Sequence, residues 1–294
     1  MATVKSYFSL VKFSHTIFAM PFAMIGFALG LNNVLSNNFF HYTTQDLIIK
    51  FSLVLLCMIS ARSAAMAFNR YLDRSFDAKN PRTAIREIPK GIISANSALA
   101  FVIICCVVFI AATYFINPIC FYLSPVALFV VLFYSYTKRF TPLCHLVLGL
   151  GLALAPIGAY LAVTGRFDLL PLLFSFAVIF WVSGFDVIYA LQDVDFDQSQ
   201  KLYSIPSVLG KAKALHVSEL LHVLSTACVI YAGFYGHFHW LYWTGIGVFT
   251  GMLVYQHSLV NPNDLSRVNI AFMTANGIAS VVFGVLVILD IMLV

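Results

Sequence analysis

Nine long apolar runs divide this 294-residue chain, and they constrain its fold more than any other feature. The chain is 61% hydrophobic and only 10% charged, whereas soluble domains carry about 25% charged residues. A run of about 20 apolar residues can cross a bilayer as a helix, and lipid offers no partner for open backbone groups. We therefore predict an all-α, polytopic membrane bundle of about nine transmembrane helices that forms one domain over residues 1–294. The predicted spans are roughly 14–32, 47–68, 96–116, 119–135, 143–163, 168–190, 214–236, 239–257 and 270–293.

The distribution of Lys and Arg predicts which way the bundle faces. Of the 17 such residues, only Lys50 and Arg166 fall toward one side when the nine spans alternate across the membrane. Cytoplasmic segments of membrane proteins carry the excess of Lys and Arg. We therefore expect an integral protein of the cell inner (plasma) membrane, with its N-terminus and its basic loops in the cytoplasm. The net charge of +5 then reflects topology, and no nucleic-acid partner is predicted.

The most charged stretch of the chain is residues 69–91, directly after the second span. Asn69, Asp73 and Asp77, the first acidic motif, are spaced four residues apart. On a helix this spacing places three oxygen-bearing side chains on one face. Such a row can hold a divalent cation, and the neighbouring Arg and Lys residues can hold an anion.

A second acidic row follows the sixth span. Asp193 and Asp197, the second acidic motif, share a helical face, whereas Asp195 points elsewhere. Asp186 lies two turns deeper, after an apolar run, and an ionisable group at that depth in a span is usually functional. A solvated acidic loop is the alternative. An even number of crossings brings both motifs to the predicted cytoplasmic side, so we expect active-site loops there.

The candidate metal ligands all offer oxygen atoms, with no His or Cys among them. Oxygen ligands disfavour a typical zinc site and favour Mg²⁺, with Mn²⁺ possible. Mg²⁺ usually takes one or two carboxylates and leaves its other positions to water and phosphate oxygens. The predicted ligands are Asn69, Asp73, Asp77, Asp193 and Asp197.

Basic residues flank both motifs and can bind an anion, although each can also be an ordinary topology signal. Arg62 differs from the others because it lies inside an apolar run, seven residues before Asn69. A buried Arg in that place is typical of a ligand for a carboxylate or a phosphate. The other flanking basic residues are Arg74, Arg82, Arg86, Lys90, Lys138, Arg139 and Lys201.

Several familiar sites are missing from the sequence. It contains no GxxxxGK[ST] phosphate loop, no GxGxxG, no GxSxG and no HExxH. The six cysteines show no CxxC spacing and are expected to be buried apolar residues. The eight histidines form no paired haem pattern.

The paired motifs resemble those of the UbiA family of intramembrane aromatic prenyltransferases. The first motif, Asn69-x-x-x-Asp73-x-x-x-Asp77, is followed by Arg82-Thr83 and Pro89-x-Gly91, as is usual in that family. The segments similar to its 4-hydroxybenzoate branch are Lys12–Phe22, Tyr189–Asp193, Gly184–Tyr189 and Leu202–Pro206.

This resemblance implies that the chain transfers a polyprenyl group from an isoprenyl diphosphate to a small aromatic acid in quinone biosynthesis. Metal-assisted ionisation of the diphosphate would precede aromatic alkylation. Asp73, Asp193 and Asp197 would be catalytic. Aromatic residues would stabilise the allylic cation, with Phe68, Tyr71, Tyr134 and Tyr136 as candidates. The implied substrate-binding residues are Arg62, Arg74, Arg82, Tyr134, Lys138, Arg139 and Lys201.

Three alternatives stay open from the sequence. The acceptor can be a naphthoate of menaquinone biosynthesis, because part of the similar subgroup is associated with that pathway. A secondary transporter also places charges in helices, but its site lies near the middle of the bilayer. A CDP-alcohol phosphotransferase also needs metal and aspartates, but its motif is one continuous stretch with glycines.

Overall fold

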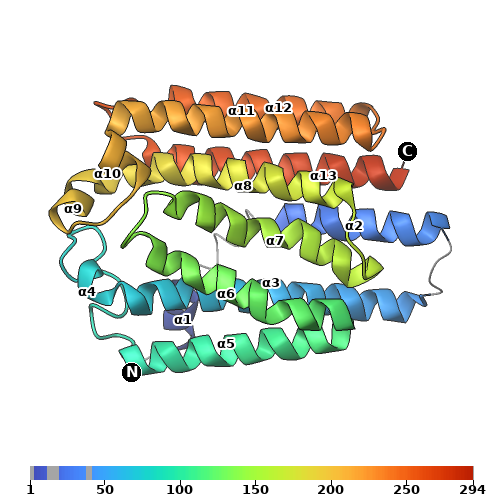
Figure 1. Ribbon diagram of the computed structural model, residues 1–294, viewed down its shortest axis with the longest axis horizontal. Helices are drawn as coiled ribbons and strands as arrows, with labels where there is room; N and C mark the ends of the chain where they lie inside the picture. The colour runs from blue at the N-terminus through green and yellow to red at the C-terminus, as the bar shows by residue number, and fades with distance from the viewer. Residues whose placement is uncertain (1–2, 12–19, 38–41, 294) are drawn as a thin grey trace.

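The computed structural model describes residues 3–11, 20–37 and 42–293, which form a bundle of helices (Figure 1). No β-strand occurs within these ranges. A 3₁₀ turn at Leu191–Asp193 follows α8, and a π-helical turn at Ile270–Ala275 precedes the last helix. The helices are α1 (Val4–Leu10), α2 (Met20–Asn37), α3 (Thr44–Leu72), α4 (Arg74–Asp77), α5 (Ala95–Ile116), α6 (Pro118–Thr137), α7 (Cys144–Thr164), α8 (Leu169–Ala190), α9 (Val194–Ser199), α10 (Ile205–Leu209), α11 (Lys211–Tyr235), α12 (Trp240–Ser258) and α13 (Asn276–Leu293).

The long helices run side by side along the longest axis of the molecule, whereas three short helices, α4, α9 and α10, gather at one end (Figure 1). Helices α4, α9 and α10 lie together at the left of that view. We call this the loop end of the bundle, and it comprises residues 73–94, 138–143 and 191–210. Both acidic motifs reach it, since α3 ends at Leu72 and α8 ends at Ala190.

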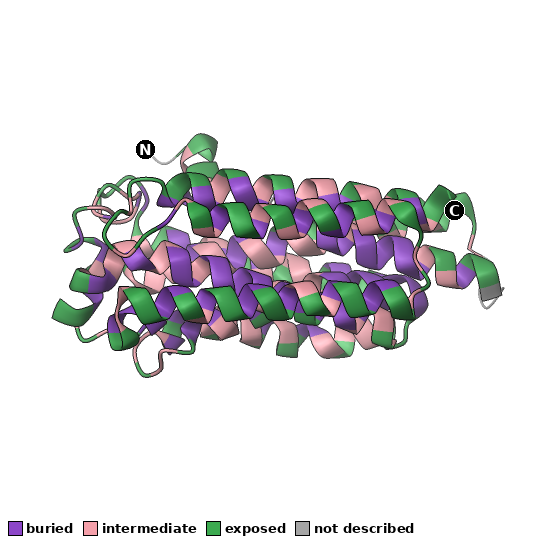
Figure 2. Ribbon diagram, turned by 90° about the horizontal axis from the view of Figure 1, so that it is seen from above, coloured by how far each residue is buried: buried purple, intermediate pink, exposed green. Residues whose placement is uncertain are grey.

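Helix α8 is buried along most of its length, and buried residues gather in the interior of the bundle (Figure 2). It packs against α7 and α11. Its Trp181 ring lies 5.2 Å from Phe22 of α2 and 5.9 Å from Phe249 of α12. The indole nitrogen donates a 2.9 Å hydrogen bond to Asn276 Oδ1 of α13, so the polar atom in this aromatic core has a partner. Four helices are thereby fixed to one another.

At the end opposite the loop end, polar side chains satisfy the carbonyls that terminate membrane helices. Asn117, the residue before α6, donates from Nδ2 to Leu161 O of α7 at 2.8 Å. Lys50 Nζ donates to Ile116 O and Ala162 O at 3.1 Å each. Helix C-termini leave their last carbonyls without intrahelical partners, and lipid cannot supply any. Lys50 therefore caps helices here, which accounts for a basic residue on the side that has few of them.

The predicted all-α membrane bundle is confirmed, and each predicted span falls on a helix where the structure describes it. Within the described residues, seven helical segments are long and apolar enough to cross a membrane, and α2 is a shorter apolar helix. Helix α12 matches the eighth predicted span, but Trp, Tyr, Gln and His residues lower its hydropathy, and it is not among the seven. Residues 14–19 of the first predicted span, with most of the Lys12–Phe22 segment, lie outside the described residues.

Close helix packing makes one glycine testable. A Cβ atom at Gly26 of α2 would lie 2.0 Å from Pro156 O of α7. Gly26→Ala should therefore separate the two helices, and overpacking of this kind typically costs about 1–3 kcal/mol. Thermal unfolding of the purified protein in detergent should show a clear fall in midpoint.

The matched control is Gly247→Ala on α12, where an added Cβ meets nothing within 4 Å. Alanine raises helix propensity, so this variant should be as stable as the wild type or slightly more stable. Equal stability of the two variants would contradict the close packing of α2 on α7.

Candidate active site

The first acidic motif spans the end of α3 and the start of α4. Asn69 lies in the last turn of α3, Asp73 follows that helix, and Asp77 closes α4. The backbone N–H of Asp73 donates to Asn69 O at 2.9 Å, and that of Asp77 donates to Asp73 O at 2.8 Å. The helical i to i+4 pattern thus continues through the break between α3 and α4, which keeps the three side chains on one face.

The connection from residue 78 to residue 94 folds back over this motif. Arg70 of α3 and Glu87 form a buried ion pair, and Ser9 of α1 donates to the same carboxylate. Thr83 Oγ1 donates to Asp77 O at 3.2 Å. These contacts fix a segment that has little regular structure, from which Arg86 reaches Asp77 and Arg82 reaches Asp193 of the second motif.

The second acidic motif starts where α8 gives way to the 3₁₀ turn and α9. Asp197 is fully buried, and Ser204 Oγ donates to its Oδ2 at 3.1 Å. Its Oδ1 is buried and lies 2.7 Å from Lys138 Nζ without a well-directed hydrogen bond. Asp195 is exposed, as the predicted helical face requires.

Four ion pairs link the two motifs and the connection between α6 and α7. Each aspartate of the motifs faces one basic side chain. Arg139 Nη2 lies 2.8 Å from Asp73 Oδ1, and Arg86 Nη1 lies 2.8 Å from Asp77 Oδ1. The remaining pairs are Arg82 with Asp193 and Lys138 with Asp197. Three of these pairs join segments far apart in the sequence, so the two motifs meet at one site: Arg139 with Asp73, Arg82 with Asp193, and Lys138 with Asp197.

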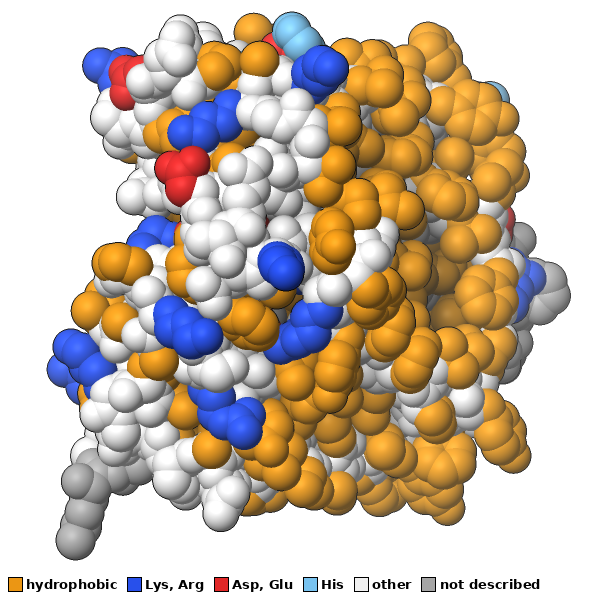
Figure 3. All heavy atoms as spheres, turned by 60° about the vertical axis from the view of Figure 1, so that its left-hand side comes forward, with side chains coloured by type: hydrophobic (Ala, Val, Ile, Leu, Met, Phe, Trp, Pro, Cys, Tyr) orange, Lys and Arg blue, Asp and Glu red, His pale blue; other side chains and the backbone are white. Residues whose placement is uncertain are grey.

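These residues line a cavity of about 350 Å³, which we call the polar cavity. Six Lys and Arg residues and five aspartates contribute to its wall. Lys and Arg side chains also gather on the surface of the loop end, beside an extensive apolar surface (Figure 3). The charged residues of the wall are Arg62, Arg70, Arg82, Arg86, Lys138, Arg139, Asp73, Asp77, Asp186, Asp193 and Asp197.

Burial and pairing act in opposite directions on the groups of this cavity. Burial raises the pKa of Asp73 above its ordinary value, although the Arg139 guanidinium lowers it. Burial lowers the pKa of Lys138, but the Asp197 carboxylate more than compensates, so its pKa is raised overall. The carboxylates are thus partly desolvated, and each depends on a nearby cation.

The structure separates the predicted substrate-binding residues into two groups. Arg62, Arg82, Tyr134, Lys138 and Arg139 line the polar cavity, as do all the predicted metal ligands. Two predicted residues do not line it. The side chain of Arg74 stacks on Tyr71 and donates to Tyr71 O at 2.7 Å. Lys201 occupies an exposed turn with φ 54°.

The four aromatic residues predicted to stabilise the allylic cation also divide into two groups. Of the four candidates, Tyr134 lines the polar cavity, whereas Phe68, Tyr71 and Tyr136 pack on one another outside it. Their sequence position next to the motif did not reveal the face of the helix on which they lie. The aromatic residues of the wall are Phe76, Tyr134, Phe185, Tyr189, Phe196 and Phe272.

Sequence reasoning also missed two polar residues of the site. Asn80 donates to Asp193 Oδ1 at 3.3 Å, and it directly follows the first motif. His145 pairs with Asp186 across α7 and α8 at 2.7 Å. Forty-one positions separate these two residues, so only the packing of the two helices brings them together.

The predicted metal ligands all offer oxygen atoms, the ligand type that Mg²⁺ prefers. Asn69 and the four motif aspartates all line one cavity. Within the described ranges, no three His, Cys, Asp or Glu residues lie close enough to hold an ion. The carboxylates are instead held apart by their basic partners, so binding a cation requires an exchange of those partners.

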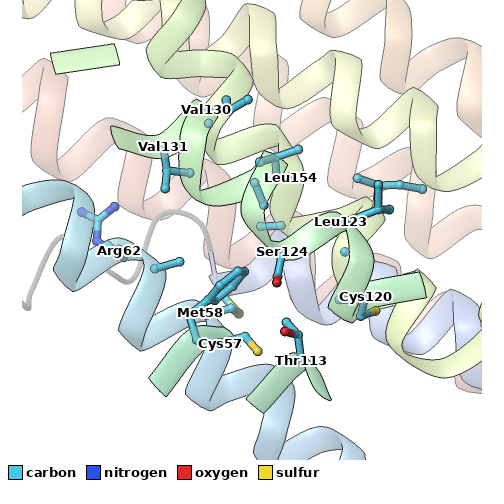
Figure 4. A pocket seen from close by; sticks show the side chains of 18 of the residues that line it. Cys57, Met58, Arg62, Thr113, Cys120, Leu123, Ser124, Val130, Val131 and Leu154 are labelled. Atoms are coloured by element: carbon cyan, nitrogen blue, oxygen red, sulfur yellow. The ribbon is translucent and has the colours of Figure 1, made fainter. Parts of the chain in front are cut away.

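A second cavity of about 370 Å³, the apolar cavity, lies deeper among α3, α5, α6 and α7. Figure 4 shows Arg62 and Met58 of α3 and Ser124 of α6 among the side chains around it. The two cavities share part of their wall, so they are neighbours. The shared residues are Arg62, Met66, Tyr134, Leu148 and Leu152.

Arg62 stands at this shared wall with its charge uncompensated. Its Nε atom is buried and has no hydrogen-bond partner. No carboxylate of the described residues forms an ion pair with it. A buried guanidinium without a partner is costly, which makes Arg62 a candidate ligand for an anion that enters the site.

The profile of the UbiA prenyltransferase family matches residues 19–278. The chain belongs to the UbiA prenyltransferase family. Family membership favours an enzyme over the transporter and the CDP-alcohol phosphotransferase considered above. The match also extends over all the residues that form the two cavities.

Curated relatives and solved structures agree with this assignment. The chain is 29% identical to the 4-hydroxybenzoate octaprenyltransferase of Tolumonas auensis over 76% of this chain and 78% of that protein. It is also 29% identical to the enzyme of that name from Burkholderia mallei, over 83% of each chain.

Among solved structures, the apo UbiA homolog from Aeropyrum pernix is 31% identical, with a TM-score of 0.81 over 94% of this chain and 98% of that one. A UbiA homolog from Archaeoglobus fulgidus, bound to DMAPP and Mg²⁺, shares the fold, with 18% identity and a TM-score of 0.72 over 98% of this chain and 100% of that one.

The ion pair beneath the loop end gives a testable prediction. Glu87→Gln should leave Arg70 buried and uncompensated, and breaking a buried pair in this way typically costs about 3–5 kcal/mol. We expect faster hydrogen–deuterium exchange over residues 78–94 and a lower unfolding temperature.

The chain's other glutamate supplies the control. Glu219 pairs with His216 on the surface, and exposed pairs contribute about 0–1 kcal/mol. Glu219→Gln should leave both measurements unchanged. Unaltered exchange over residues 78–94 in Glu87→Gln would show that this pair does not hold the loop.

Proposed function

We propose that this UbiA-family enzyme transfers a polyprenyl group from an isoprenyl diphosphate to a small aromatic acid of the 4-hydroxybenzoate type, for quinone biosynthesis. One observation carries the proposal: a polar cavity with paired acidic motifs adjoins an apolar cavity through a shared wall. That combination suits a substrate with a diphosphate at one end and a hydrocarbon chain at the other. The names of the curated relatives support the acceptor class and the polyprenyl donor.

The polar cavity would hold the diphosphate together with Mg²⁺. Mg²⁺ would be held by Asn69, Asp73, Asp77, Asp193 and Asp197, and when bound it supplies positive charge that stabilises the departing diphosphate. In the structure, four basic side chains neutralise the motif aspartates: Arg82, Arg86, Lys138 and Arg139. Once released from the aspartates, these basic side chains would bind diphosphate oxygens and stabilise the charge that develops as the C–O bond breaks.

The apolar cavity would hold the first isoprene units of the donor. Its wall is almost entirely hydrocarbon, which excludes the water that would trap an allylic cation. Tyr134 lies in the shared wall, and an aromatic face there can stabilise such a cation by about 0.5–2 kcal/mol. Val126 and Phe167 line the cavity and are 58% and 53% exposed. Their exposure supports an opening through which a longer chain would pass into lipid.

The aromatic acceptor would bind beside the wall that the two cavities share. We propose that Arg62 binds its carboxylate, because this guanidinium has no carboxylate partner among the described residues. Arg74, another of the predicted substrate-binding residues, lies away from both cavities.

The charge distribution supports a cytoplasmic active site in the plasma membrane. Among the described Lys and Arg residues, only Lys50 and Arg166 lie toward the end opposite the motifs. By the positive-inside rule, the loop end should face the cytoplasm.

Product formation tests the proposal. The purified protein with Mg²⁺, a mixture of polyprenyl diphosphates and a panel of aromatic acids should give a prenylated acid, detected by mass spectrometry. Chelation of the metal should abolish it. No product with any acid of the panel would contradict the proposal.

The division of basic residues also gives a matched comparison. Arg82→Gln and Lys138→Gln remove cations of the polar cavity, and loss of one such donor typically lowers turnover by about 10²–10³-fold. Arg74→Gln and Lys201→Gln remove cations outside it. These should keep near-wild-type turnover under saturating substrates. Similar losses in all four variants would indicate that general surface charge, and not the cavity, matters.

A further inference from the structure

Asp186 differs from the other aspartates of the polar cavity. The four motif aspartates each face a Lys or Arg side chain. Asp186 lines the same cavity, with 25% of its side chain exposed, and its partner in the structure is the imidazole of His145. Among the described residues, no Lys or Arg side chain forms an ion pair with the Asp186 carboxylate, although it lies in the site.

The hydrogen bonds of His145 define its role. This residue is buried in the first turn of α7, and its Nδ1 lies 2.7 Å from Asp186 Oδ2. Its Nε2 accepts a hydrogen bond from the backbone N–H of Ile205 at 3.3 Å. A nitrogen that accepts carries no proton, so Nδ1 holds the proton and donates it to Asp186. The positive end of the α7 dipole also disfavours an imidazolium here.

Contacts between α7 and α8 fix this pair. Ser183 Oγ donates to His145 O at 3.0 Å. A Cβ at Gly149 would lie 2.5 Å from Ile179 O, so the two helices approach closely just beyond the pair. The imidazole is held on one oxygen of Asp186, Oδ2, and the second oxygen, Oδ1, forms no hydrogen bond within the described residues.

Asp186 lines the polar cavity only, and it lies deeper in the bundle than the second acidic motif. It lies seven residues before Asp193 on α8, which is about 10 Å along a helix at 1.5 Å per residue. Arg62 and Tyr134, which belong to the wall shared by both cavities, also line the polar cavity. A diphosphate bound by the motifs would therefore have its reacting carbon on the Asp186 side.

We propose that Asp186 is the base that removes the ring proton of the aromatic acceptor, and that His145 positions it. This inference rests on the proposed function. The C–O bond of the donor breaks, and its electron pair leaves with the diphosphate. A ring carbon of the acceptor then forms the new C–C bond. The C–H electron pair returns to the ring and the proton passes to Asp186 Oδ1, and Asp186 then loses this proton to water, which restores the carboxylate.

A kinetic isotope effect separates this role from a structural one. The donor is geranyl diphosphate with Mg²⁺, and the acceptor is 4-hydroxybenzoate, either unlabelled or deuterated at both ring positions next to the hydroxyl. In the wild type, proton removal by a positioned base is fast, so the two acceptors should react at the same rate. Asp186→Asn should lower turnover by about 10²–10⁴-fold, the usual contribution of general base catalysis. Proton loss should then limit the rate, so the deuterated acceptor should react more slowly.

Three further variants complete the test. Asp195→Asn, an exposed aspartate outside the cavity, should match the wild type. Asp186→Glu restores a carboxylate and should recover turnover relative to Asp186→Asn. His145→Leu should lower turnover and reveal an isotope effect, because the base is present but no longer held. Thermal stabilisation by geranyl diphosphate and Mg²⁺ shows that each variant is folded.

The outcomes distinguish the two proposals. Absence of product from the wild type with either acceptor would overturn the proposed function and, with it, this inference. Wild-type turnover in Asp186→Asn would overturn the inference alone. So would reduced turnover without an isotope effect, or an Asp186→Glu variant no more active than Asp186→Asn, since both indicate a structural role.

Discussion

Each aspartate of the two acidic motifs needs a nearby cation, and the arrangement of the loop end follows from that requirement. Partly desolvated carboxylates are unfavourable without compensation. The chain supplies the compensation from other segments, so Arg82 reaches Asp193, and Lys138 reaches Asp197. These pairs hold the connections after α3, α6 and α8 together in place of regular secondary structure. The same side chains that neutralise the aspartates are those suited to bind a diphosphate.

The membrane setting explains why the polar and apolar cavities adjoin. Backbone groups in lipid are satisfied within helices. Charged side chains are costly in the middle of the membrane, so they gather at the ends of the bundle. A site at the end of long helices has polar loops above it and hydrocarbon below it. Arg62 and Tyr134 stand at the boundary, in the wall that both cavities share. A substrate with a diphosphate and a hydrocarbon tail matches this boundary without any separate binding domain.

Much of the fold could be predicted from the sequence because apolar length and helix are linked so directly in membrane proteins. Counting the crossings also placed Asp73 and Asp193 on one side of the bundle, where the structure brings them to one cavity. Local order was harder to predict. Arg74 directly follows Asp73 within the first motif, yet it packs on Tyr71.

Contacts between distant helices were beyond the sequence patterns. His145 follows a short loop after α6 and carries no motif of its own, yet the packing of α7 on α8 pairs it with Asp186. The aromatic candidates next to the first motif lie outside the cavity. The sequence did not show on which face of the helix they would lie. Tyr189, by contrast, belongs to the Tyr189–Asp193 segment that resembles the family, and its side chain lines the cavity. Arg82 Nη1 lies 3.0 Å from its hydroxyl oxygen.

The central claim is that a metal and a diphosphate together replace the basic partners of the motif aspartates. The most direct measurement is the unfolding temperature of the purified protein with Mg²⁺ alone, geranyl diphosphate alone, and both. We predict that both together stabilise the wild type by more than the sum of the separate effects. Asp73→Asn and Asp193→Asn should lose this synergy, and Asp195→Asn should keep it. Additive effects in the wild type, or full synergy in either motif variant, would contradict the account.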